Sequence, residues 1–119
     1  MLLQTPSPVA VLGTTVLLAL FLSFTAHLAA RNVLGAVDPR RALYVGPLPA
    51  VVGVVGGALT IPAFVTVPVA LAVDAVMFDW SYEEERRVVL AMTAIHVVIT
   101  ILLGVVLGGI ALLLATRPT

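Results

Sequence analysis

Four long apolar segments separated by short polar connections dominate the hydropathy pattern of the chain. The segments cover residues 9–30, 42–59, 61–78 and 88–115. As helices, the first and last are long enough to cross a hydrocarbon core of roughly 30 Å. A single helix over residues 42–78 would be about 55 Å long with Pro62 and Pro68 inside it, which no ordinary bilayer accommodates. The uncharged sequence between Gly56 and Pro62 offers a turn instead. The pattern therefore predicts an all-α fold with four membrane-spanning helices.

Local sequence signals indicate where the second and fourth helices begin. Asp38-Pro39 has the form of a helix start, with Asp as the N-cap and Pro in the first turn. Pro47 follows soon after and disturbs least if a new first turn begins there. Ser81, followed three residues later by Glu84, has the form of a capping box. We therefore expect the fourth helix to begin in water at Ser81 and then to enter the membrane.

The positions of the arginines indicate an orientation in the membrane. Four spans place both arginine-rich connections on one side, against Arg117 alone on the other side. Because cytoplasmic loops carry an excess of basic residues, this favours an antiparallel up-down four-helix bundle with both termini outside the cell membrane. Aromatic residues near the connections suit the membrane interface. The residues expected at the membrane surface are Arg31, Arg40, Arg41, Trp80, Tyr82, Arg86 and Arg87.

Composition agrees with a membrane protein and excludes several function classes. Hydrophobic residues make up 61% of the 119 residues and charged residues 10%, whereas soluble domains are about half apolar and a quarter charged. Residues 1–119 therefore form a single transmembrane domain, with the lipid bilayer as its first partner. A net charge of zero provides no basic field for nucleic acid, and the absence of cysteine excludes disulfides and Cys-ligated metals.

Small and polar residues recur along one face of each predicted helix. Such residues mark helix contacts in lipid, where hydrophobic burial cannot bring helices together. The stripe on the first helix consists of Thr15, Ala19, Ser23, His27 and Arg31. The pairs Gly53-x-x-x-Gly57 and Gly104-x-x-x-Gly108 have the spacing of close helix-packing motifs. They predict either packing within the monomer or an interface with a second copy or another membrane protein.

Three ionisable residues, His27, Asp74 and His96, lie inside or near the ends of the apolar segments. All three fall in the cytoplasmic half of their helices, and Thr93 and Thr100 lie on the same face as His96. Charged groups in lipid are costly unless paired, so we expect these side chains to face one another or a water-filled pocket. Two interpretations remain open: a proton relay or divalent-cation site, and interhelical hydrogen bonds that fix the bundle.

The sequence contains no nucleophile elbow, no phosphate-binding loop and no paired metal-ligand motif such as His-Glu-x-x-His. It therefore predicts no catalytic residue, no metal and no cofactor. We expect a non-enzymatic subunit or scaffold that packs with itself or with another membrane protein. The alternative is a small proton- or cation-handling transporter or channel-like protein that uses the intramembrane His and Asp residues.

Two sequence runs around the first connection carry a family resemblance. They are AHLAARNVLG at residues 26–35 and RRALYVGPLP at residues 40–49. Together they resemble a group of short uncharacterised multi-pass membrane proteins from haloarchaea. The resemblance implies an archaeal cell membrane as the setting, and it implies no activity.

Overall fold

The computed structural model describes residues 7–118, and this part of the chain is helical without any strand. The helices are α1 (Pro8–Leu34), α2 (Arg40–Leu43), α3 (Pro47–Ala58), α4 (Ala63–Tyr82) and α5 (Arg86–Thr116). Helices α2 and α3 together occupy one apolar segment. With this pair taken as one unit, the chain has four helical segments that are long and apolar enough to cross a membrane. The all-α prediction and the number of long apolar helices are confirmed.

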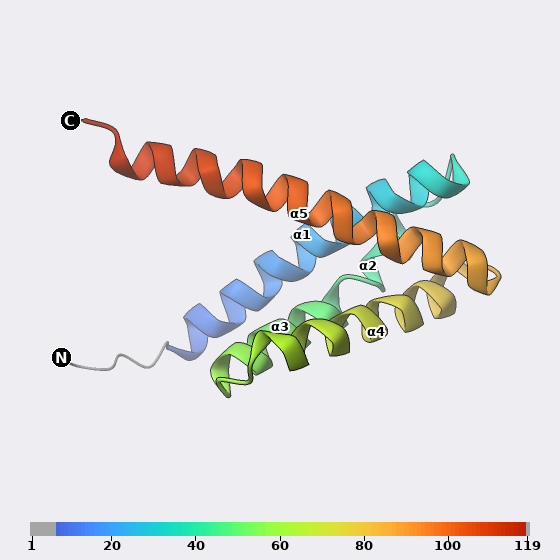
Figure 1. The fold of residues 1–119 in the computed structure, drawn as a ribbon, viewed down its shortest axis with the longest axis horizontal. Helices are drawn as coiled ribbons and strands as arrows, with labels where there is room; N and C mark the ends of the chain where they lie inside the picture. The colour runs from blue at the N-terminus through green and yellow to red at the C-terminus, as the bar shows by residue number, and fades with distance from the viewer. Residues whose placement is uncertain (1–6, 119) are drawn as a thin grey trace.

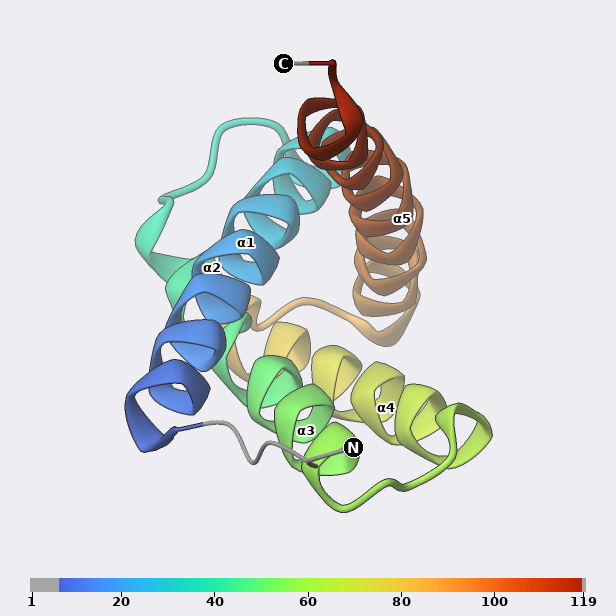
Figure 2. The ribbon, with the colours of Figure 1, turned by 90° about the vertical axis from the view of Figure 1, so that its left-hand side faces the viewer.

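The long helices run alternately in opposite directions (Figure 1). The α1–α2 and α4–α5 connections lie toward one end of the molecule. The start of α1, the α3–α4 turn and the end of α5 lie toward the other, which we call the outer end (Figure 1). Helix α1 packs against α3 and α5, and α4 packs against the same two helices. Helices α1 and α5 cross and then diverge toward the outer end (Figure 2).

Helix α1 is closed at both ends by residues suited to these positions. The Ser7 hydroxyl accepts a hydrogen bond from the backbone N–H of Ala10 at 3.0 Å, and Pro8 follows in the first turn. At the other end Gly35 has φ of 85°, a conformation that side chains rarely adopt, and its N–H donates to the Arg31 carbonyl at 2.9 Å. Between these caps α1 extends for about 40 Å.

The second apolar segment is divided into two helices. The Asp38 carboxylate accepts from the N–H of Arg40 at 3.0 Å, so a helix starts near the predicted Asp38-Pro39 signal. This helix, α2, ends at Leu43, and α3 begins at Pro47. Proline has no N–H, and the first turn of a helix does not need one, so a new helix start is the favourable place for Pro47. The apolar segment predicted over residues 42–59 is therefore divided near its start, at residues 44–46, and α3 begins at Pro47, where a new first turn disturbs least.

Two backbones approach closely at the break between α2 and α3. A Cβ atom added to Gly46 would lie 2.5 Å from the carbonyl oxygen of Ala19 and 2.5 Å from the backbone nitrogen of Ser23. Gly56 plays a similar part between α3 and α4, where an added Cβ would lie 2.7 Å from the side chain of Thr66. These two glycines let neighbouring helices approach closely.

The predicted glycine pairs behave differently. A Cβ on Gly53 would make only an ordinary contact, 3.8 Å from Leu18, and a Cβ on Gly57, Gly104 or Gly108 would meet nothing within 4 Å. Apart from Gly53, the predicted helix-packing glycines therefore do not pack within the described monomer. Gly46 lies on the small-residue face predicted for the second segment, although it belongs to neither glycine pair. Spacing missed Gly56, because no glycine lies four residues away from it.

The predicted capping box at Ser81 is wrong. Helix α4 continues to Tyr82, and the N-cap of α5 is Glu85. The Ser81 hydroxyl instead donates to the carbonyl of Arg41 at 2.7 Å, and the Arg41 guanidinium donates to the carbonyl of Ser81 at 2.7 Å. This reciprocal pair joins the end of α4 to α2. The chain then turns at Glu83, which has a left-handed φ of 53° and closes α4.

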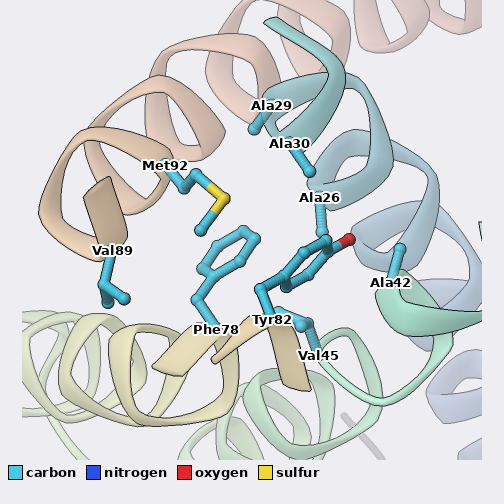
Figure 3. Packing of buried hydrophobic residues seen from close by; sticks show 9 residues of the cluster. All are labelled: Ala26, Ala29, Ala30, Ala42, Val45, Phe78, Tyr82, Val89 and Met92. Carbon is cyan, nitrogen blue, oxygen red and sulfur yellow. The ribbon is translucent and has the colours of Figure 1, made fainter. Parts of the chain in front are cut away.

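A compact apolar core lies where α1, α2, α4 and α5 meet (Figure 3). Phe78 and Met92 are its largest fully buried side chains. Small side chains on α1 make room for them, as Figure 3 shows for Ala26, Ala29 and Ala30. The core therefore depends on large residues from α4 and α5 packing against a flat alanine face of α1.

The predicted surface residues separate into two groups. The five arginines predicted at the surface are all exposed. Trp80 is 63% exposed and packs edge-on against Tyr44, with ring centroids 5.7 Å apart. Tyr82 departs from the prediction, because it is only 6% exposed and lies in the core beside Phe78. Its position at the end of α4 turns the ring inward under α1 and α2 (Figure 3).

Candidate functional site

Asp74 of α4 and His96 of α5 form a buried pair inside the bundle. Asp74 is 4% exposed and His96 is 3% exposed. The Nδ1 atom of His96 lies 2.6 Å from Oδ2 of Asp74. The two helices are thus joined by a polar contact in a region otherwise surrounded by apolar side chains. Such pairing is what an ionisable residue inside a membrane-type bundle requires.

The other ring nitrogen of His96 faces α1. Its Nε2 atom lies 2.8 Å from the Thr25 hydroxyl oxygen and 3.1 Å from the carbonyl oxygen of Leu22. The Thr100 hydroxyl donates to the Thr25 hydroxyl at 3.1 Å, and Thr25 donates to the Leu22 carbonyl at 3.1 Å. We call Asp74, His96, Thr25 and Thr100 the polar network. It links α1, α4 and α5 through side chains that a lipid environment would not solvate.

The acceptors around the imidazole indicate where its protons lie. Because a carbonyl oxygen can only accept, we assign a proton to Nε2 of His96, which donates toward Thr25 and Leu22. The short contact between Nδ1 and Asp74 holds a second proton, bound either to the ring or to the carboxyl group. In both arrangements the pair has no net charge. A neutral pair is the least costly form in a low-dielectric interior.

Two further features complete the surroundings of the pair. The ring of Phe78 meets the His96 imidazole edge-on, with centroids 5.5 Å apart and planes at 85°. On another side lies a pocket of about 320 Å³, which Asp74, His96 and Thr100 line together with apolar side chains of all four long segments. The second carboxyl oxygen of Asp74, Oδ1, is buried and has no hydrogen-bond partner among the described residues. The network therefore has one unused acceptor, which is buried, on a side chain that also lines the pocket.

Two residues of the predicted polar cluster lie outside this network. His27 lines a separate pocket with Phe24 and Arg40, and its Nδ1 has no hydrogen-bond partner within the described part of the chain. The Thr93 hydroxyl donates to the carbonyl of Val89 in its own helix at 2.8 Å. Asp74 and His96 contact each other, and Thr100 joins their network through Thr25.

Thr25 is the member of the network that sequence reasoning missed. It lies two residues before His27, and residues two apart on a helix point about 200° away from each other. The stripe that placed His27 inward therefore turned Thr25 outward. A signal was nevertheless present, because Thr25 is followed by Ala26, Ala29 and Ala30, a run of small residues typical of a packed helix face.

The structure gives little support to a divalent-metal site. Among residues 7–118 no group of three His, Cys, Asp or Glu side chains is placed to hold a metal ion. The imidazole of His96 and the carboxylate of Asp74 contact each other through Nδ1 and Oδ2. The arrangement is suited to holding and exchanging protons and to fixing three helices relative to one another.

Comparison with known proteins gives one match. A family model described as a family of unknown function, DUF7473, matches residues 5–118. No curated protein and no solved structure matches the chain. Nearly the whole chain is therefore covered by a family for which no activity is described.

Proposed function

We propose that this chain, which belongs to the family of unknown function DUF7473, is a small multi-pass protein of the cell membrane that serves as a non-enzymatic subunit or scaffold and pairs with a second copy of itself. Four helical segments of spanning length and apolar character support the membrane setting. The resemblance to haloarchaeal membrane proteins supports an archaeal cell membrane. The arginine-rich connections then lie on the cytoplasmic side.

The observation that carries the proposal is the outer part of α5. Every residue from Gly104 to Pro118 is exposed. Figure 1 shows this part of α5 leaving the bundle and running away from α1. We call Gly104–Thr116 the outer arm. It is about 20 Å long, and no other described part of the chain covers it.

The chemistry of the outer arm suits contact with an identical helix. Gly104 and Gly108 are four residues apart on one face of the arm, and Ala111 continues that face, so it carries almost no side chain. Such a face lets two helix backbones approach closely enough for van der Waals contact. Residues 104–115 contain no charged side chain, so pairing needs no complementary charge. A two-fold interface brings the same face of both copies together, which a glycine seam permits.

The mass of the full-length tagged protein, extracted from its own membrane in mild detergent, tests this proposal. The wild type is expected to have the mass of two chains. The double variant Gly104→Ile and Gly108→Ile is expected to have the mass of one chain, since the added side chains separate the backbones. Gly13→Ile is the matched control, because Gly13 also lies on an exposed helix surface with nothing within 4 Å of its Cβ position.

Three outcomes would count against pairing of identical chains. A monomeric wild type removes the proposal, as does a dimer that survives both substitutions in the outer arm. The third outcome is a different protein that co-purifies in equal amount and is lost in the double variant. The outer arm would then bind that protein instead of a second copy, and the subunit role would remain.

A second candidate function, proton handling, is favoured by the buried His96–Asp74 pair beside its pocket. The pair holds a proton between two groups that can each carry it, which is the property a proton relay needs. In proteoliposomes with an entrapped pH-sensitive dye, a proton flux that His96→Ala abolishes in a correctly folded protein would support this function. A protein that conducts no protons, or conducts equally well after the substitution, would contradict it.

A further inference from the structure

A polar pocket of about 350 Å³ lies between α2 and the end of α4, separate from the pocket beside the polar network. We propose that it binds the headgroup of a membrane phospholipid that carries both a phosphate and an ammonium group, as ethanolamine phospholipids do. The volume falls within the roughly 300–1,000 Å³ of small-molecule sites. The inference rests on the membrane setting of the proposed function, and it does not depend on pairing through the outer arm.

Opposite charges line this pocket in equal number. Arg40 and Arg41 contribute two guanidinium groups, and Asp38 and Glu83 contribute two carboxylates. All four residues are exposed, so a ligand can reach their charged groups. Within residues 7–118 none of the four takes part in an ion pair. The pocket therefore presents cations and anions that no described side chain neutralises.

The signs of these charges select the ligand. A ligand with only a phosphate would bind the guanidinium groups but would be repelled by the carboxylates, and a ligand with only an ammonium group would meet the reverse problem. A headgroup with both charges can place its phosphate at the arginines and its ammonium group at the carboxylates. The Asp38 carboxylate already accepts from the N–H of Arg40, whereas no described residue donates to the Glu83 carboxylate. Glu83 is therefore the main expected acceptor for the ammonium group.

Two contacts between the α2 region and α4 hold the walls of the pocket in place. The Arg41 guanidinium donates to the carbonyl of Ser81 at 2.7 Å, and the Ser81 hydroxyl donates to the carbonyl of Arg41 at 2.7 Å. The rings of Tyr44 and Trp80 pack edge-on, with centroids 5.7 Å apart. Arg41 has further N–H groups that remain for a phosphate, and the exposed ring of Trp80 can attract an ammonium group. The binding groups are thus positioned before the ligand arrives, which lowers the cost of binding.

The surroundings of the pocket suit the headgroup level of a membrane. Asp38 belongs to the α1–α2 connection and Glu83 to the α4–α5 connection, which lie toward the same end of the molecule (Figure 1). Trp80 is exposed there, as is typical of aromatic residues at a membrane interface. Val76 lies four residues earlier on the same face of α4 and is also exposed. It offers an apolar surface to the tails of a lipid, and a soluble ligand would make no use of that surface.

Native mass spectrometry of the full-length tagged protein, stripped of lipid in mild detergent, tests the inference. The probes are dioleoyl lipids with identical tails: phosphatidylethanolamine, phosphatidylglycerol, which lacks the ammonium group, and trimethylammonium propane, which lacks the phosphate. We expect phosphatidylethanolamine to bind about fivefold more tightly than either of the others, the upper end for one exposed ion pair. The same spectra count the chains, so a failure of pairing through the outer arm is distinguishable from a failure of lipid binding.

Two matched pairs of variants locate the binding charges. Glu83→Gln is expected to remove the preference for phosphatidylethanolamine over phosphatidylglycerol, and Arg40→Gln is expected to remove the preference over the cationic lipid. Glu85→Gln and Arg87→Gln remove the same charges from exposed residues that do not line the pocket, so both preferences are expected to remain. A folding defect would weaken the binding of all the lipids alike and would leave the preferences unchanged.

Each remaining outcome overturns the inference. Equal binding of the lipids would mean that they form only a nonspecific layer around the helices. Tightest binding of phosphatidylglycerol would make the pocket an anion site, and tightest binding of the cationic lipid would make it a cation site. Displacement of phosphatidylethanolamine by an equal concentration of glycerophosphoethanolamine would mean that the pocket takes a soluble headgroup and not a lipid. Preferences that persist in Glu83→Gln and Arg40→Gln would place the selectivity outside the pocket.

Discussion

Asp74→Ala is expected to lower the free energy of unfolding by about 3 kcal/mol, because it leaves the buried His96 without its partner. Removing one member of a buried ion pair costs about 3–5 kcal/mol in water-soluble proteins. The low end applies because the imidazole can release its proton and stay neutral. The remaining cost is then that of a buried ring nitrogen without a donor or acceptor, about 1–3 kcal/mol. Unfolding in mixed micelles, followed by circular dichroism, measures the difference.

Two controls separate the lost contact from a general effect of substitution in the bundle. Asp74→Asn keeps the size of the side chain and can donate to His96, so we expect a loss of about 1 kcal/mol. Thr93→Val removes a hydroxyl that bonds only to its own helix, and we expect a change within about 0.5 kcal/mol. If Asp74→Ala costs no more than Thr93→Val, the pair does not hold α4 and α5 together.

Gly46→Ala is expected to destabilise the bundle by about 3 kcal/mol, the upper end for overpacking a close contact. The added Cβ would meet backbone atoms of Ala19 and Ser23 on α1. Backbone atoms cannot rotate away as a side chain can, so α1 and the α2–α3 segment must separate. The same unfolding measurement applies.

Gly57→Ala provides a control of opposite sign in the same segment. Gly57 is exposed within α3, and a Cβ there meets nothing within 4 Å. Alanine gains about 0.5–1 kcal/mol over glycine in a helix interior, and this is the upper bound at Gly57, the second-last residue of α3. A loss of stability in Gly57→Ala similar to that in Gly46→Ala would show that the close approach of α1 at Gly46 is not the cause.

The parts of the fold that follow from local chemistry could be predicted from the sequence. Apolar length alone gives the long helices, because lipid leaves few other ways to satisfy the backbone. Pro47 indicates a helix start because its missing N–H is tolerated only in the first turn. The depth of Asp74 and His96 in their helices placed them at similar levels, and they do meet.

The parts that depend on helix rotation and distant contacts could not be predicted in this way. Ser81 has a capping sequence, yet its hydroxyl bonds to Arg41, which is forty positions away in the chain. The depth of a residue along α1 does not determine which face of the helix turns inward. The sequence therefore indicated His27, and not Thr25, as the partner of His96. The close approach at Gly46 depends on how α1 crosses α2 and α3, and nothing within the local sequence encodes that crossing.

In the membrane setting proposed above, the tight α3–α4 turn affects how the chain enters the bilayer during synthesis. The segment Arg40–Ala58 is the least apolar of the four, and only residues 59–62 separate α3 from α4. Within this turn the N–H of Ile61 donates to the Gly56 carbonyl at 2.9 Å, and the tip carries no charge. The two helices can therefore insert as one hairpin with its backbone already hydrogen-bonded. Helix α4 thus helps a weaker span cross, and no charged side chain at the tip has to pass through the hydrocarbon.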